Sequence, residues 1–150
     1  MFFRKSIKNL LSKAETELVM QAIRMHEQPT SGEIKIFIES SCEHSNAFER
    51  AKELFIQLKM NETVDRNAVL IYIATEDKAF ALCADKGIVE KADPLFWNAE
   101  AKLLSSYFVE QKYVQGLQNC IANIGQVLKA HFPWEGENKN ELPDEIVFGK

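Results

Sequence analysis

The sequence predicts an α/β fold built around a small mixed β-sheet, with about four helices. Three segments predict the sheet. Ala68–Ala74 is a continuous apolar run rich in β-branched and aromatic residues, which is typical of a strand covered on both faces. Glu33–Glu39 alternates apolar and polar residues with the period of a strand. Ala79–Ala84 resumes the apolar pattern after a run of turn-forming residues, so we expect it to return antiparallel to Ala68–Ala74 as a hairpin.

Two helices are expected before the hairpin. Ser12 and Glu15 form a capping box that predicts a helix start, followed by an apolar stripe that ends before Pro29. Ser45 and Asn46 are capping residues for a second helix, which is expected to end near Met60. A helix between two strands predicts a βαβ crossover, so the first two strands should be parallel and start at the same edge of the sheet. We expect the first strand to be less buried than the second.

Two more helices are expected after the hairpin. Asp93 supplies a capping side chain and Pro94 suits the first helical position, which predicts a third helix there. A second apolar stripe over 113–131 predicts a fourth helix, which should pack antiparallel to the third and end before Pro133.

The last residues, 134–150, are expected to form an extended, partly docked tail outside an α/β domain of residues 1–133. Pro143 and the polar residues disfavour a helix, but exposing the apolar side chains of this tail to water would forfeit about 1.5–3 kcal/mol for each large one. We expect them to lie over a groove on the helical layer; they are Leu142, Ile146, Val147 and Phe148.

Composition limits the functional classes. A chain of 150 residues with 46% hydrophobic content suits one globular domain. A net charge of -4 and a pI near 5.5, without a basic helix face, argue against a nucleic-acid partner. We expect no membrane span and no export signal, and therefore a cytoplasmic protein. The odd count of three widely spaced cysteines predicts free thiols.

Polar residues gather at the edge where the first two strands begin. Carboxylates, an amide oxygen and backbone carbonyls are the ligands of a hard cation such as Ca²⁺ or Mg²⁺. The predicted metal ligands are Asp85, Asp65, Glu33 and Asn67, with Arg66 and Gly87 in supporting positions. The alternative is a solvated strand end in which Arg66 forms an ion pair with Asp85. No nucleotide-binding loop or other familiar catalytic motif is present, so we expect no nucleotide cofactor.

The opposite edge offers an alternative anion site. Ser41, His44 and Ser45 precede the start of the second helix, and a helix N-terminus attracts anions such as phosphate. His44 would serve there as an acid or base. The alternative is a polar loop in which Ser45 or Asn46 only caps the helix.

Several stretches resemble the TPM domain family. They are the capped first helix, TSGEIKIFIE, ERAKELFIQL, DRNAVLIYIATEDKAFALCADKGI and YVQGLQNCIANIG, and the closing NELPDEI is similar to a soluble bacterial branch. The family includes a thylakoid-lumen acid phosphatase, a photosystem II repair protein and a receptor modulator. The resemblance implies a three-layer α/β/α sandwich around the mixed sheet. Many relatives have Gly-x-Gly after the third strand, where this sequence has Asp85-Lys86-Gly87.

The resemblance also implies function. Divalent-cation binding is known in the family, and some members have phosphatase activity. The sequence therefore predicts a TPM-like module that binds Ca²⁺ or Mg²⁺ at the acidic edge. The alternatives are a metal-assisted acid phosphatase, in which the cation polarises a phosphoryl oxygen, and a metal-independent domain that binds a protein partner.

Overall fold

The computed structural model describes residues 10–43, 46–134, 136 and 145–149. Its sheet has four strands in the order β3-β2-β1-β4. β1 (Glu33–Glu39) and β2 (Ala68–Ala74) are parallel, with Glu33 opposite Ala68. β3 (Ala79–Ala84) returns antiparallel to β2, and β4 (Ile146–Phe148) lies parallel to β1 at the other edge. The predicted crossover and hairpin are confirmed.

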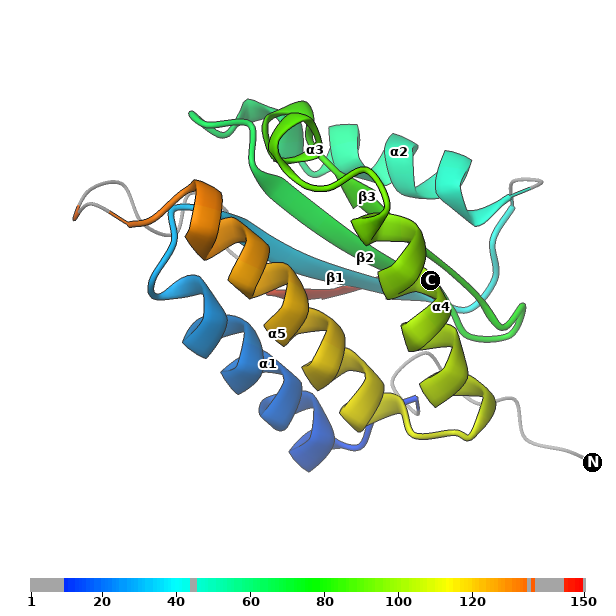
Figure 1. Cartoon of the computed structure of the whole chain (residues 1–150). Helices are drawn as coiled ribbons and strands as arrows, with labels where there is room; N and C mark the ends of the chain where they lie inside the picture. Colours follow the sequence, from blue (N-terminus) through cyan, green and yellow to red (C-terminus); the bar gives the residue numbers. More distant parts are fainter. Residues whose placement is uncertain (1–9, 44–45, 135, 137–144, 150) are drawn as a thin grey trace, which may run out of the picture.

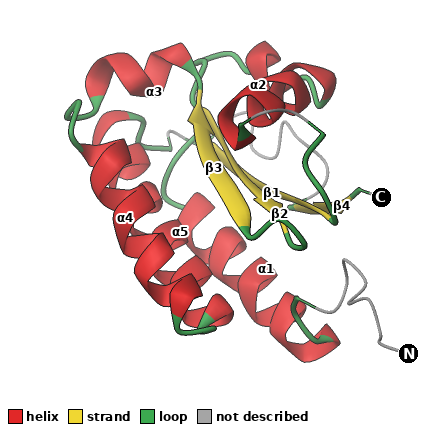
Figure 2. Cartoon of the chain, turned by 90° about the vertical axis from the view of Figure 1, so that its right-hand side faces the viewer, coloured by secondary structure: helices red, strands yellow, loops and turns green. Residues whose placement is uncertain are grey.

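Helices cover both faces of this sheet. α1 (Lys13–Glu27), α4 (Phe96–Val109) and α5 (Tyr113–His131) lie on one side, and α2 (Ala47–Gln57) lies on the other, followed by the short 3-10 helix η2 (Met60–Glu62) (Figure 1, Figure 2). α3 (Lys86–Lys91) lies next to the end of β3. The fold is the three-layer sandwich that the family resemblance implies.

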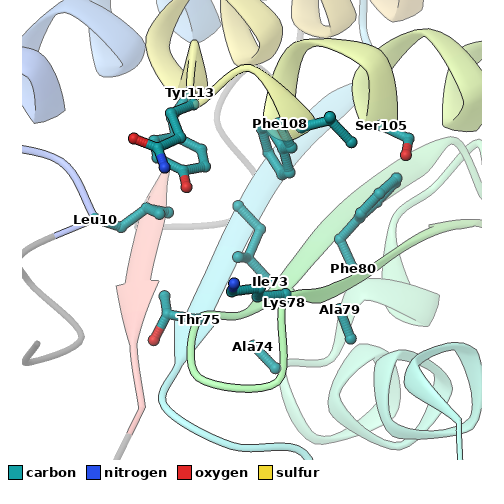
Figure 3. Close-up of a pocket in the computed structure, with 12 residues that line it drawn as sticks. Leu10, Ile73, Ala74, Thr75, Lys78, Ala79, Phe80, Ser105, Phe108 and Tyr113 are labelled. Carbon is teal, nitrogen blue, oxygen red and sulfur yellow. The ribbon is translucent and has the colours of Figure 1, made fainter. Parts of the chain in front are cut away.

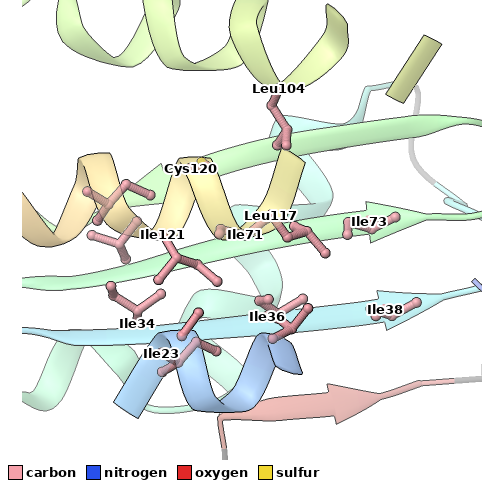
Figure 4. Close-up of a cluster of buried hydrophobic side chains, with 14 of the residues drawn as sticks. Ile23, Ile34, Ile36, Ile38, Ile71, Ile73, Leu104, Leu117, Cys120 and Ile121 are labelled. Atoms are coloured by element: carbon pink, nitrogen blue, oxygen red, sulfur yellow. The ribbon is translucent and has the colours of Figure 1, made fainter. Parts of the chain in front are cut away.

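The alternation of side chains along the strands divides the core into two layers. One face of β1 and β2 packs against α1, α4 and α5 through residues that include Ile36, Ile71 and Leu117 (Figure 4). The other face packs against α2 through residues that include Leu70, Tyr72 and Phe55. Burying each of these large side chains contributes about 1.5–3 kcal/mol, so both faces of the sheet are needed for stability.

Four details differ from the sequence-based predictions. α3 is a fifth α-helix, where no helix was expected, because Asp85 accepts a hydrogen bond from the Lys86 N–H and Ile88 is buried. α4 begins at Phe96, since Asp93 and Pro94 form a turn instead, in which Asp93 Oδ1 accepts from the Leu95 N–H. All seven residues of β1 are buried, because β4 covers its outer edge.

The tail is the fourth difference. Its described part does not lie over the helical layer but extends the sheet as β4. The Ile36 N–H donates to the Glu145 carbonyl (2.9 Å) and the Gly149 N–H donates to the Ile38 carbonyl (2.7 Å). Extended backbone beside an open strand satisfies the main-chain groups of both strands, which a helical surface does not offer. Leu142 lies outside the described residues.

Two edges of the sheet, meaning here the two ends of its parallel strands, are therefore available for function. The residues before β1 and β2 meet at one edge, and the β2–β3 turn lies at the other. Cys42, Cys83 and Cys120 are free thiols, as predicted. Within the described residues, no helix is both long and apolar enough to cross a membrane.

Candidate functional site

Ser31, Asp65 and Asn67 form a hydrogen-bonded group at the edge where the parallel strands begin. The Ser31 hydroxyl donates to Asp65 Oδ2 (3.0 Å) and accepts from the Asn67 side-chain amide (3.1 Å). The register that places Glu33 opposite Ala68 brings Ser31 next to the loop before β2. One hydroxyl therefore fixes the orientation of both an acidic and an amide side chain.

Asn67 has an oxygen atom without a partner. Its residue is fully buried, and its Oδ1 atom makes no hydrogen bond within the described structure. The Asn67 N–H, in contrast, donates to the Thr63 hydroxyl (3.3 Å). A buried acceptor that loses its water without gaining a donor costs about 1–3 kcal/mol. Such an atom at a polar edge is a candidate position for a ligand.

Arg66 and Asp85 form a second group at the same edge. Arg66 Nε donates to Asp85 Oδ2 (2.7 Å) and Arg66 Nη2 donates to Asp85 Oδ1 (2.9 Å). The hydrogen bonds to Asp85 raise the pKa of the Arg66 guanidinium. Arg66 has a left-handed backbone (φ 53), and Asp85 is buried. The ion pair of the alternative interpretation is therefore formed.

Gly87 packs directly on this loop. A Cβ atom at Gly87 would lie 2.3 Å from the Asp65 carbonyl oxygen and 2.5 Å from that of Arg66. No side chain fits at that distance from a backbone oxygen, so the position requires glycine. Glu33, the remaining predicted ligand, begins β1 and is buried.

The edge fits a partly hydrated cation better than one enclosed by protein. Among the described residues, no three His, Cys, Asp or Glu side chains are close enough together to hold a metal ion. The oxygen atoms that the edge does offer are the Asp65 carboxylate and the unpartnered Asn67 Oδ1. A cation held by one or two carboxylates and several waters, as Mg²⁺ often is, needs no larger cluster.

The opposite edge contains a buried ion pair. Arg50 donates to both carboxylate oxygens of Glu39 (2.9 Å each), and the Tyr72 hydroxyl also donates to Glu39. Burial raises the pKa of Glu39, but the hydrogen bonds from Arg50 and Tyr72 outweigh burial and hold that pKa below its usual value. This cluster joins β1, β2 and α2 and satisfies its own charges.

The alternative anion site is only partly described. Ser41 is exposed, while His44 and Ser45 lie outside the described residues. Asn46 caps α2, because its side chain accepts from the Glu49 N–H (2.8 Å). The predicted role of Ser41, His44 and Ser45 in anion binding stays a prediction.

The comparisons with known proteins identify the family. The sequence profile of the TPM domain matches residues 6–127. The chain belongs to the TPM domain family. None of the functionally curated proteins matches the sequence significantly.

Solved structures extend this assignment of a TPM domain. The BA42 protein of the psychrophilic bacterium Bizionia argentinensis is 36% identical, with a TM-score of 0.86 over 97% of this chain and 100% of that chain. The N-terminal domain of a P. gingivalis protein is 17% identical (TM-score 0.66; 86% of this chain and 83% of that chain). The N-terminal domain of the cg2496 protein of Corynebacterium glutamicum is 10% identical (TM-score 0.64; 96% and 92%). The last two share the fold.

Ser31 is the site residue that sequence reasoning missed in this TPM domain. It belongs to a turn before β1, and nothing in its immediate sequence separates it from an ordinary turn serine. The parallel pairing of the two strands would have predicted its position. Residues that lie the same number of positions before two paired residues of parallel strands are expected to lie side by side. Applied to 31–33 and 66–68, that rule places Ser31 beside the predicted ligands.

Proposed function

We propose that this TPM domain is a binding module that takes up one partly hydrated Ca²⁺ or Mg²⁺ at the edge formed by Asp65 and Asn67. The unpartnered, buried Asn67 Oδ1 carries this proposal. A cation beside it would replace the missing donor, and the Asp65 carboxylate, held through the shared Ser31 hydroxyl, would supply the negative charge.

Asp85 has a conditional role in this proposal. Its two oxygens are engaged by the Arg66 guanidinium, and Oδ1 also accepts from the Lys86 N–H (2.8 Å). A cation at the edge would compete with Arg66 for the same carboxylate. Arg66 is partly exposed, so it has room to release Asp85 when a cation arrives. Glu33 begins β1 at the same edge, and the proposal requires no bond between it and the cation.

A titration of the amide NMR spectrum with CaCl₂ and MgCl₂ tests the site. We expect saturable shifts of Ser31, Asp65, Asn67 and Gly87, and an affinity at least about tenfold lower in Asp65→Asn, because affinity follows the charge of the ligands. Asp85→Asn should weaken binding less. Asp93→Asn is the matched control, since Asp93 is an exposed acid whose amide replacement can still accept the Leu95 N–H. Equal affinities in all four proteins would remove this site.

The same variants separate the two alternative functions. A metal-assisted phosphatase would hydrolyse p-nitrophenyl phosphate in a reaction that survives repurification, needs the cation and falls with Asp65→Asn or Asp85→Asn. A metal-independent interaction domain would instead bind a basic protein partner equally well in EDTA and in calcium.

A further inference from the structure

A cavity of about 340 Å³ lies at the other end of the sheet from Asp65 and Asn67. It is bounded by the β2–β3 turn, the end of α4 and the start of α5 (Figure 3). Open α/β sheets often bind ligands beyond the carboxyl ends of their strands, and this cavity lies beyond Ala74, the last residue of β2. Its volume is within the range of small-molecule sites and far above that of ordinary packing defects.

Aromatic side chains form the apolar part of the lining. Phe80 and Phe108 meet edge to face with ring centroids 5.5 Å apart, and Phe108 and Tyr113 do the same at 5.3 Å. Ile73 completes this wall from the centre of the sheet. These rings come from β3, α4 and α5, so the packing between three elements fixes their orientation. A flat apolar group suits such a rigid aromatic wall.

The polar residues of the lining include one cation, Lys78. Figure 3 shows the Lys78 side chain beside Ile73, with its ammonium nitrogen on the side of the cavity where Leu10 and Thr75 lie. None of the ion pairs between described residues involves Lys78. α5 begins at Tyr113 without a side-chain cap, so its first N–H groups add positive potential where Tyr113 lines the cavity.

The neighbouring carboxylates are engaged elsewhere. Glu110 pairs with Lys112 (3.1 Å), and Asp77 accepts a hydrogen bond from the Cys42 N–H (2.6 Å). Glu76 also has a partner. Among the described residues of the lining, the charge that a ligand meets is therefore that of Lys78.

Two residues with a left-handed backbone lie at this cavity. Lys78 (φ 51) and Gln111 (φ 61) both line it, and they are two of the four described non-glycine residues with a left-handed backbone. Both positions are ordinary for this conformation, because Lys78 ends the β2–β3 turn and Gln111 follows the end of α4.

We propose that this cavity binds a small organic anion with an aromatic body. The ring would lie against Phe80, Phe108 and Tyr113, and the anionic group would pair with the Lys78 ammonium. The proposal is independent of the cation site, which lies at the other end of β2.

Titration of the full chain with 4-phenylbutyrate in EDTA, followed by amide NMR, tests the proposal. We expect saturable shifts at Thr75, Phe80, Ser105 and Tyr113 with a Kd in the millimolar range, as a fragment of this size gives. Lys78→Met should weaken binding about fivefold, the upper end of the range for an exposed ion pair. Lys102→Met is the matched control, because Lys102 is an exposed lysine of α4 that does not line the cavity.

The neutral analogue 4-phenylbutanamide separates the charge from the ring. The amide should bind wild type and Lys78→Met with equal affinity. That affinity should match the lower affinity of 4-phenylbutyrate for Lys78→Met. Non-saturating shifts, shifts centred away from the cavity, or equal binding of the carboxylate to wild type and Lys78→Met would overturn the proposal. Because EDTA removes divalent cations, neither result depends on the cation site.

Discussion

Arg66 and Asp85 close the open end of the β2–β3 hairpin through two parallel hydrogen bonds of 2.7 and 2.9 Å, although 19 positions separate them in the sequence. The antiparallel register places Val69 opposite Ala84, so the residues just outside the two strands meet there. The pair holds together the loop before β2 and the start of α3. The pairing also occupies the Asp85 carboxylate, for which a cation at this edge would compete.

Arg66→Met is predicted to raise the affinity for Ca²⁺ or Mg²⁺ by about fivefold or more. The reason is that the Arg66 guanidinium and the cation compete for the Asp85 carboxylate, so each weakens the binding of the other. The variant should also melt at a lower temperature in EDTA, since Asp85 then lacks its partner, and regain stability when the cation is added. Isothermal calorimetry and thermal unfolding measure the two effects. Lys86→Met controls for the loss of one positive charge at this edge; if it gives the same gain in affinity, competition for Asp85 is not the cause.

Gly87→Ala is predicted to destabilise the domain by about 1–3 kcal/mol, the usual range for overpacking. The new methyl group would meet two backbone carbonyl oxygens, of Asp65 and Arg66, which move only if α3 moves away from the loop. Urea unfolding measures the loss. Glu90→Ala, at an exposed position of the same helix, controls for helix propensity. A Gly87→Ala protein as stable as Glu90→Ala would show that α3 does not pack as closely as described.

The sequence predicted the elements whose signals are local. The apolar run of β2 and the Ser12–Glu15 capping box each depend on neighbouring residues, and both are present. The three-residue strand β4 could not be predicted, because its pairing with β1 joins positions more than a hundred residues apart. α3 was missed because Gly87 disfavours a helix locally, whereas its contact with the loop before β2 is tertiary.

The sequence predicted which residues gather at the candidate site, but not which hydrogen bonds and ion pairs they form. The edge gathers Asp65, Asn67 and Asp85, in agreement with strand order and direction. The same residue types fit either an ion pair or a set of metal ligands, and only the geometry shows that Asp85 is bound by Arg66. Likewise, the unpartnered oxygen of Asn67 depends on which atoms of the side chain meet Ser31, which no sequence pattern specifies.

Glu100→Gln is predicted to make stability less dependent on pH. Burial raises the pKa of Glu100 despite hydrogen bonds from Asn123 and Cys120. A carboxyl group with a raised pKa in the folded state binds its proton more tightly there, so its favourable contribution is complete below the unfolded value of 4.5 and is lost as the pH rises through the folded pKa. The difference in free energy of unfolding between the variant and wild type should therefore shift by about 1 kcal/mol in favour of the variant as the pH rises from 4 to 8.

Urea unfolding of both proteins at the two pH values measures this difference. Glu90→Gln is the control, because Glu90 is exposed and carries no burial penalty. A parallel pH dependence of wild type and Glu100→Gln would show that Glu100 is solvated in the native protein, contrary to its 7% exposure and its Oε1 atom without a hydrogen-bond partner in the described structure.

Deleting residues 140–150 is predicted to lower the melting temperature by several degrees, as expected for the loss of about 2 kcal/mol or more from a domain of this size. The described part of this segment is β4, in which Ile146 packs on one face of the sheet and Val147 on the other. The deletion removes both side chains and frees the Ile36 N–H, which donates to the Glu145 carbonyl. Hydrogen exchange of the Ile36 amide should accelerate together with the fall in melting temperature.

Ile146→Asp should reproduce much of the loss of stability and Phe148→Asp less of it, because Phe148 is exposed. An unchanged melting temperature with a protected Ile36 amide in the truncated protein would show that β4 does not pair with β1 in solution.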